Sequence, residues 1–298
     1  MKIVDYSAVN SGLNNYAVLL YENLKSEFNA SYENHYAKRY YINAVINRLS
    51  RLSSKIENDT AIFTNFLAIR NKYKREFIVI HDSFLWKYGS NIEKFLFFTL
   101  NITLNGEFIY NSYYTKSKYD NDKGTVIYPF IYKKFYTDIN IRPFLNSYIL
   151  TDYNIYPNKN VELYNQIYKN DNHEFLHIGS CIQGVKSLTG LSLEDVYNTY
   201  INARALLFLS KEEGFGYPLA QAGLLGIPII MLDNEINREI YGYSKYYYND
   251  VIGDNYKINR EIFADMTMDI DFLNKKKKEL REKFNPINQL NQWKLLLK

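Results

Sequence analysis

Residues 205–230 read ALLFLSKEEGFGYPLAQAGLLGIPII and contain one complete strand–loop–helix–strand unit. The run 205–209 is continuously apolar, which is expected of a strand that is covered on both faces. Pro218 suits the first turn of the following helix, and Gly226 suits the residue that ends it. The apolar run 227–232 then begins a second strand. This order of elements predicts an α/β fold with a parallel sheet.

The loop between the first strand and the helix has the chemistry of a ligand site. It follows the carboxyl end of a strand, where open parallel sheets bind their ligands. Gly214 and Gly216 let the backbone N–H groups approach a ligand, and the helix N-terminus adds partial positive charge. Glu213 precedes these amides, and Gln221 follows inside the helix. A carboxylate suits sugar hydroxyls and amides suit phosphate, so the loop predicts a nucleotide-sugar site. The alternative is a tight turn in which Glu213 meets only solvent.

The same alternation of short apolar runs and helical patterns extends over the whole chain. Strands are expected at residues 3–4, 77–80, 108–110, 125–128, 148–151, 175–178, 205–209 and 227–232. Regular patterning fades between residues 136 and 146, around Pro143. We therefore expect two Rossmann-like domains with parallel sheets facing a cleft, at residues 1–140 and 146–285. A separate helix at 286–298 is expected to return toward the first domain.

Composition excludes several classes of protein. The chain has 298 residues, 47% of them hydrophobic and 23% charged, as in globular proteins. A formal net charge of +4 does not by itself indicate a nucleic-acid partner. The single cysteine, Cys181, fits a reducing compartment, and no apolar run reaches the roughly 20 residues that span a bilayer. We expect a cytoplasmic protein that binds no nucleic acid.

Two features bear on partners and metals. The basic run 275–278 is expected to be the solvated face of a helix, with peripheral binding to an anionic membrane as the alternative. His177 and Cys181 alone would make a poor zinc site. An Asp-x-Asp signature for a metal-bound diphosphate is absent, and the nearest stretch is 120–122. We therefore expect no metal and no cofactor.

Residues 210–218, SKEEGFGYP, with Gln221 and the GIP of 226–228, resemble the signature of the retaining glycosyltransferases of family four. That family has the two-domain GT-B fold. The resemblance implies that Glu213 contacts the donor sugar, and that Gln221 stands where the family has a glutamate that binds the ribose. A glutamine can still hydrogen-bond to a ribose diol. It also implies that the amides of Gly214, Phe215 and Gly216 hold the donor.

The similarity continues on both sides of this signature. Residues 148–161, YILTDYNIYPNKNV, resemble the start of the family's donor domain. Lys159 is thereby implied as the lysine of the diphosphate, and Asn154 falls near the place of a family arginine. Residues 189–203 resemble the loop and helix before the signature, which places Leu191 near the base.

In the first half of the chain the resemblance is weaker but follows the same order. Gly12 lies where the family has a glycine loop close to the donor phosphates. His81 follows the strand at 77–80 and corresponds to a histidine beside the transferred sugar. The alternative for His81 is a purely structural histidine.

Together these features predict a retaining, metal-independent hexosyltransferase. Its donor would be a nucleotide-diphosphate sugar, UDP- or GDP-linked, and its acceptor a glycan, lipid or protein. Two alternatives stay open. The chain could be a nucleotide-sugar-binding protein with little turnover, since Gln221 and Asn154 depart from the family pattern. It could also be another sugar-nucleotide enzyme, such as an epimerase.

Overall fold

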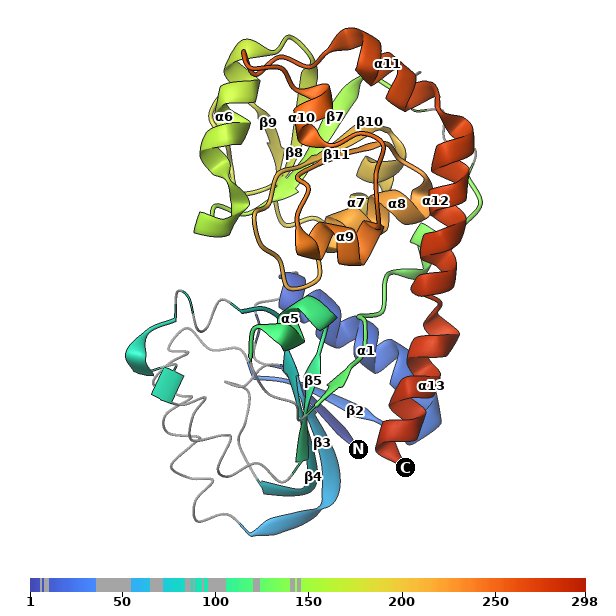
Figure 1. Cartoon of the computed structure of the whole chain (residues 1–298). Helices are drawn as coiled ribbons and strands as arrows, with labels where there is room; N and C mark the ends of the chain where they lie inside the picture. The colour runs from blue at the N-terminus through green and yellow to red at the C-terminus, as the bar shows by residue number, and fades with distance from the viewer. Residues whose placement is uncertain are drawn as a thin grey trace. The chain divides into compact units, whose positions relative to one another are not determined.

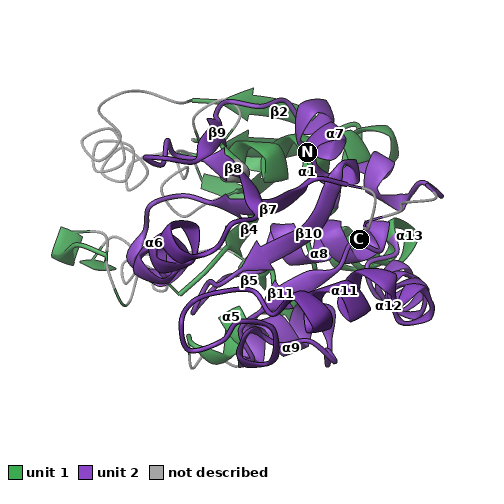
Figure 2. Cartoon of the chain, turned by 90° about the horizontal axis from the view of Figure 1, so that it is seen from above, with its two compact units in different colours: residues 1–130, 286–298 green, residues 131–285 purple. Residues whose placement is uncertain are grey.

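The computed structural model of the chain describes residues 1–5, 7, 11–35, 55–64, 72–83, 87, 89–92, 94–95, 106–119, 124–139, 143 and 146–298. The chain divides into two compact units, which Figure 2 distinguishes by colour. Unit 1 consists of Met1–Phe130 and Pro286–Lys298, and unit 2 consists of Ile131–Asn285. Each unit has its own parallel sheet, so the predicted α/β class with two parallel sheets is confirmed.

Unit 1 is built on a parallel sheet whose described strands follow the order β2-β1-β3-β4-β5-β6. These strands are β1 (Lys2–Asp5), β2 (Ser31–Asn34), β3 (Ile56–Phe63), β4 (Lys72–Ile80), β5 (Gly106–Tyr110) and β6 (Thr125–Val126). The described helices of the unit are α1 (Gly12–Phe28), α5 (Tyr113–Ser117) and α13 (Pro286–Leu297). The strands β2 and β3 were not expected, because their sequences mix polar and apolar residues without regular alternation.

Local sequence explains where the helices of unit 1 begin and end. The side chain of Ser11 accepts a hydrogen bond from the amide of Asn14 at 3.2 Å and caps α1. Asn29 ends this helix in the left-handed conformation, which asparagine tolerates. Ser112 caps α5 by accepting from the amide of Thr115 at 2.9 Å.

The C-terminal helix α13 belongs to unit 1, where it runs beside α1 (Figure 1). Lys294 forms an ion pair with Glu27 of α1 at 2.8 Å. The buried Gln289 donates a hydrogen bond to the carbonyl of Pro129 at 3.1 Å. Trp293 is 1% exposed, so its whole ring is removed from water.

Unit 2 contains a second parallel sheet in the order β11-β10-β7-β8-β9. Its strands are β7 (Tyr148–Tyr153), β8 (Glu174–Gly179), β9 (Lys186–Leu188), β10 (Ala203–Phe208) and β11 (Ile229–Met231). Its helices are α6 (Val161–Asn170), α7 (Leu193–Ile201), α8 (Tyr217–Leu225), α9 (Glu235–Tyr241), α10 (Tyr248–Val251), α11 (Arg260–Met268) and α12 (Ile270–Lys283), with the short 3-10 helices η2 (Lys133–Tyr136) and η4 (Pro157–Lys159).

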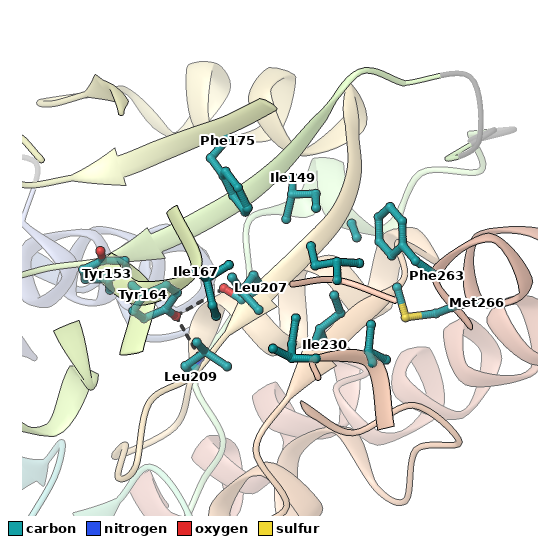
Figure 3. Packing of buried hydrophobic residues seen from close by; sticks show 14 residues of the cluster. Ile149, Tyr153, Tyr164, Ile167, Phe175, Leu207, Leu209, Ile230, Phe263 and Met266 are labelled. Carbon is teal, nitrogen blue, oxygen red and sulfur yellow. Dashed lines mark hydrogen bonds between the residues drawn. The ribbon is translucent and has the colours of Figure 1, made fainter. Parts of the chain in front are cut away.

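The core of unit 2 lies around β7 and β10, in the middle of its sheet (Figure 3). Tyr164 of α6 is fully buried there, and its hydroxyl donates to the carbonyl of Leu207 at 3.2 Å. The same hydroxyl accepts from the amide of Leu209 at 2.8 Å. These two bonds satisfy backbone groups where β10 ends, and they tie α6 to the start of the following loop.

The division between the units comes earlier in the chain than the expected stretch 136–146. The 3-10 helix η2 belongs to unit 2, because Phe135 is fully buried there. Its ring packs edge-on against Tyr197 and Tyr200 of α7, with 5.6 Å between ring centroids in each case. The chain therefore enters unit 2 before its regular sequence pattern fades.

The basic run 275–278 was expected to be a solvated face of a helix, but its lysines differ in exposure. Lys275 and Lys278 are exposed on α12, but Lys276 is only 9% exposed. Its ammonium group pairs with Glu279 at 2.9 Å and lies over the ring of Tyr241. Among the described residues, no helix is long and apolar enough to cross a membrane.

Replacing Trp293 by alanine tests the packing of α13 on unit 1. Trp293→Ala should lower the free energy of unfolding by about 3 to 5 kcal/mol, because it removes a fully buried ring and leaves a cavity. Urea unfolding provides the measurement. Leu295→Ala is the matched control on the same helix, since Leu295 is 77% exposed. Equal stability of the two variants would contradict the packing described.

Candidate functional site

Two of the predicted site residues meet at the carboxyl edge of the unit 2 sheet. Lys159 ends η4, which follows β7, and Glu213 lies in the loop after β10. Because β7 and β10 are neighbouring parallel strands, both segments leave the sheet at the same edge. The ammonium group of Lys159 forms an ion pair and hydrogen bond with Oε1 of Glu213. Their side chains are 16% and 12% exposed, so the pair is partly shielded but still reached by solvent.

The loop between Glu213 and α8 is shaped by a glycine and a buried phenylalanine. Gly216 caps α8 with φ 83°, a left-handed conformation that favours glycine. The ring of Phe215 is buried and packs edge-on against Tyr217 and Phe284, so this residue can offer only its backbone. Pro218 lies in the first turn of α8, as predicted, and has no N–H to offer.

The amides of the first turn of α8 are partly used within the helix. Those of Leu219 and Ala220 donate to the carbonyl of Gly216 at 3.0 and 3.3 Å. Gln221 lies inside α8 and is 7% exposed.

The remaining predicted donor residues of unit 2 lie on loops at the same edge. Asn154 directly follows β7 and is exposed. Leu191 follows β9 and is partly buried, next to Gly190 in the left-handed conformation. Since all five strands are parallel, their carboxyl ends share one edge, but direct side-chain contact is seen only between Lys159 and Glu213 among the predicted residues that the structure describes.

A residue that the sequence analysis did not single out holds the two halves of the site together. The side chain of Asn158 is 2% exposed and donates from Nδ2 to the carbonyl of Glu212 at 2.7 Å. The carbonyl of Asn158 accepts from the amide of Lys211 at 2.8 Å. These bonds join the residue before Lys159 to the residues before Glu213. A single asparagine in a turn gives no sequence signal for such a role.

A second unexpected residue is an acid whose pKa responds to both members of the ion pair. Asp152 lies in β7, and its Oδ2 accepts from the hydroxyl of the fully buried Tyr200 at 2.7 Å. Burial raises the pKa of Asp152 from 3.8 to about 6, and the nearby Glu213 acts in the same direction. The hydrogen bond from Tyr200 and the charge of Lys159 oppose this rise in pKa.

The two predicted residues of the first half, Gly12 and His81, belong to unit 1. Gly12 is the first residue of α1. His81 follows β4, its ring packs edge-on against Tyr16 of α1 at 4.6 Å between centroids, and Nε2 donates to the carbonyl of Thr64. Burial lowers the pKa of His81 from 6.5 to about 4, so its ring is neutral at pH 7.

Thr64 in turn connects His81 to a buried acid. The hydroxyl of Thr64 donates to Oδ1 of Asp5 at 2.9 Å, at the end of β1. Asp5 also accepts from Asn14, Tyr32 and Asn34 at 3.0–3.1 Å. The carboxyl edge of the unit 1 sheet is thus lined by polar side chains that hydrogen-bond to one another.

Other candidates from the sequence do not form a site in the described residues. No group of three or more His, Cys, Asp or Glu side chains there could hold a metal ion. His177 is fully buried and bonds through Nδ1 to the hydroxyl of Thr151 at 3.1 Å, whereas Cys181 is exposed. The stretch 120–122 lies outside the described residues. A surface hollow of about 410 Å³ on α12 contains none of the predicted site residues.

No family model matches the chain, and no curated protein matches it in sequence. Solved structures resemble it over its whole length. HepE from Anabaena, in complex with UDP and glucose, superposes with a TM-score of 0.70 at 14% identity, covering 100% of this chain and 99% of HepE. Sucrose-phosphate synthase from Thermosynechococcus elongatus gives a TM-score of 0.73 at 13% identity, with 100% and 95% covered.

A third similar structure is matched over a smaller share of its own chain. The pneumococcal O-GlcNAc transferase GtfA, in complex with UDP and GlcNAc, gives a TM-score of 0.56 at 14% identity, covering 87% of this chain and 60% of GtfA. At such identities the likeness concerns the fold alone. The fold of this chain is GT-B, as the sequence predicted.

The neutral state of His81 predicts a pH dependence of stability. Since the folded pKa lies below the unfolded value, the unfolded chain binds this proton more tightly. The contribution of the neutral His81 to the free energy of unfolding is fully present above pH 6.5 and is lost as the pH falls through about 4. The free energy of unfolding should therefore fall by about 2 to 3 kcal/mol over this range in the wild type but not in His81→Asn. Parallel pH profiles of the two proteins in urea unfolding would contradict this.

Asn158→Ala tests the connection between η4 and the loop after β10. Loss of the bond to the carbonyl of Glu212 should lower the free energy of unfolding by about 1 kcal/mol and speed amide hydrogen exchange at residues 211–216. Asn154→Ala is the matched control, because Asn154 is exposed. Unchanged exchange in Asn158→Ala would show that the loop is held by other contacts.

Proposed function

We propose that the chain is a retaining glycosyltransferase that transfers a hexose from a nucleotide-diphosphate sugar held by unit 2. The observation that carries the proposal is the ion pair of Lys159 and Glu213 at the carboxyl edge of the sheet. The pair combines, within one contact, a cation suited to a diphosphate and a carboxylate suited to sugar hydroxyls. A glycine-rich loop and the N-terminus of α8 lie directly after it in the chain.

In this proposal each partner of the ion pair exchanges the other for a group of the donor. Lys159 turns to the diphosphate, and Glu213 accepts hydrogen bonds from hydroxyls of the sugar. Neither charge is left without a partner, so the exchange avoids the high cost of an unpaired, partly buried charge. In the protein without a bound donor, the ion pair keeps both side chains in the site.

The backbone of the loop supports the same ligand. Amides of Gly214, Phe215 and Gly216 are proposed to donate to the sugar hydroxyls and phosphates, with the positive end of α8 behind them. Such fixed dipoles stabilise the negative charge that develops as the diphosphate departs. Gln221 is proposed to bind the ribose, Leu191 to pack near the base, and Asn154 to lie close to the phosphates.

The reaction would proceed on one face of the sugar. The acceptor oxygen forms a bond to the anomeric carbon as the bond to the diphosphate oxygen breaks, and the leaving phosphate takes the acceptor proton. Lys159 compensates the charge of the leaving group, so this scheme needs no metal and no separate base. His81 and Gly12 of unit 1 are proposed, on the family resemblance, to contact the transferred sugar and the donor phosphates. A neutral His81 could do so by hydrogen bonding.

The structural neighbours guide the choice of donor. HepE has been crystallised with UDP-glucose, and GtfA with UDP and GlcNAc. Both share the fold of this chain, so we propose a uridine diphosphate sugar as the donor. The acceptor is proposed to be a glycan, lipid or protein, and the protein to act in the cytoplasm, with or without peripheral binding to a membrane.

A second function has a specific observation in its favour. Asn154 and Gln221 stand where the resembled family has an arginine and a glutamate, so the site has fewer charges for phosphate and ribose. A protein that binds a nucleotide sugar and turns it over slowly would tolerate both departures. Measurement of the turnover rate distinguishes such a binding protein from a transferase.

Release of UDP from UDP-glucose, with and without candidate acceptors, tests the proposed transferase. Glu213→Gln should lower the rate by about 100-fold or more, because the sugar loses a charged acceptor that orients it, while the variant remains folded. Glu162→Gln is the matched control, an exposed acid of α6. Equal rates for wild type and Glu213→Gln would overturn the assignment of the site.

A thermal-shift panel of nucleoside diphosphates and their sugars separates the two functions. A transferase and a binding protein are both stabilised by their ligand. Stabilisation by UDP-glucose without release of UDP in any acceptor mixture favours the binding protein. No stabilisation by any member of the panel contradicts both.

A further inference from the structure

The C-terminal end of α12 carries a buried ring that contacts the loop after β10. Phe284 directly follows α12 and is 0% exposed. Its ring packs edge-on against the ring of Phe215, with 5.4 Å between the ring centroids. Phe215 is 3% exposed, so both rings are removed from water. Its two neighbours in the chain, Gly214 and Gly216, have no side chains that could anchor this part of the loop.

The backbone of Phe284 is held by a different segment of unit 2. Its carbonyl accepts a hydrogen bond from the hydroxyl of Tyr136 in η2 at 2.6 Å. Its amide donates to the carbonyl of Leu280, one turn earlier in α12, at 2.8 Å. The last carbonyls of a helix have no partner inside it, so the hydroxyl of Tyr136 satisfies one of them. Tyr136 therefore fixes the residue whose ring contacts Phe215.

The contact between α12 and α8 fixes the same end of α12 from another side. A Cβ atom on Gly223 of α8 would lie 2.2 Å from Cδ1 of Leu280, so the two helices touch one turn before Phe284. Leu280 is 2% exposed at this contact. The position of the Phe284 ring is thus set by α8 and by η2 together.

The geometry points to Phe284 as a positioning residue of the donor site, which acts through the ring of Phe215 on the backbone of the loop after β10. This inference rests on the proposed function for the identity of the ligand. Glycines on both sides of Phe215 give the free loop many backbone conformations. A ring that is fixed in the core restricts these conformations before a donor binds, and this lowers the entropy cost of binding.

Phe284→Leu tests this role, with Phe263→Leu as the matched control. Both replace a buried phenylalanine of unit 2, but Phe263 lies on α11 and packs against His173 and Arg204. Each variant should lower the urea midpoint of unfolding, because each leaves a cavity. Phe284→Leu alone should also raise the Kd of UDP-glucose, by about tenfold, in isothermal titration calorimetry. Equal Kd values in the two variants would overturn the proposal.

A double-mutant cycle shows whether Phe284 acts through Phe215. Phe215→Leu should itself raise the Kd of UDP-glucose, and Phe284→Leu should add little to that rise in the double variant, because the contact is already lost. If the two increases in Kd multiply instead, the two residues act independently and the proposed action through the ring contact is wrong.

Tyr136→Phe gives a second test, which also applies if Phe284→Leu does not fold. It removes the hydroxyl that binds the carbonyl of Phe284 and keeps the ring. Tyr148→Phe is its matched control, since the hydroxyl of Tyr148 donates to the carbonyl of Thr199, also at 2.6 Å, at the start of β7. Tyr136→Phe should raise the Kd of UDP-glucose by about threefold, and Tyr148→Phe should leave it unchanged. The same Kd in both variants would contradict the positioning role.

Amide hydrogen exchange at residues 211–216 without ligand separates this inference from the proposed function. Exchange there should be faster in Phe284→Leu than in Phe263→Leu, and faster in Tyr136→Phe than in Tyr148→Phe. If UDP-glucose fails to bind the wild type while exchange differs in this way, the result speaks against the proposed donor and supports the positioning of the loop. Equal exchange within both pairs of variants would overturn the positioning role.

Discussion

The parallel pairing of β7 with β10 is the constraint on which the unit 2 site depends. Parallel neighbours deliver their chains to the same edge of a sheet, so η4 and the loop after β10 lie side by side. Lys159 and Glu213 therefore meet although 54 residues separate them in the chain. Buried apolar residues hold the register, with Leu206 opposite Leu150, so the strand ends cannot slide without exposing core.

The electrostatics of the site follow from this geometry. An ion pair exposed to solvent contributes little to the free energy of unfolding. In the partly shielded pair of Lys159 and Glu213 each charge compensates the other, so neither is left unpaired. Asn158 fixes the backbone beside each partner. The loops that carry Lys159 and Glu213 are thus joined both by their side chains and by Asn158.

Much of the fold was predictable from particular sequence features. The run 205–209, Pro218 and Gly226 predicted β10, α8 and the turn after it. Glu213 and Lys159 were both singled out from the sequence, and the structure brings them into contact, while their role at a ligand stays a prediction. The strands β2 and β3 were missed, because pairing inside the sheet, rather than local pattern, makes those segments extended.

The sequence by itself determined the α/β class, four of the five described strands of unit 2, and the helix α8 between β10 and β11. These depend on local periodicity, caps and glycines, which act over a few residues. Only the tertiary structure decided that Asn158 joins the two loops, that Tyr200 donates to Asp152, and that Phe215 turns its ring into the core. Those roles arise from contacts between segments far apart in the chain, whose distances and burial no local pattern encodes.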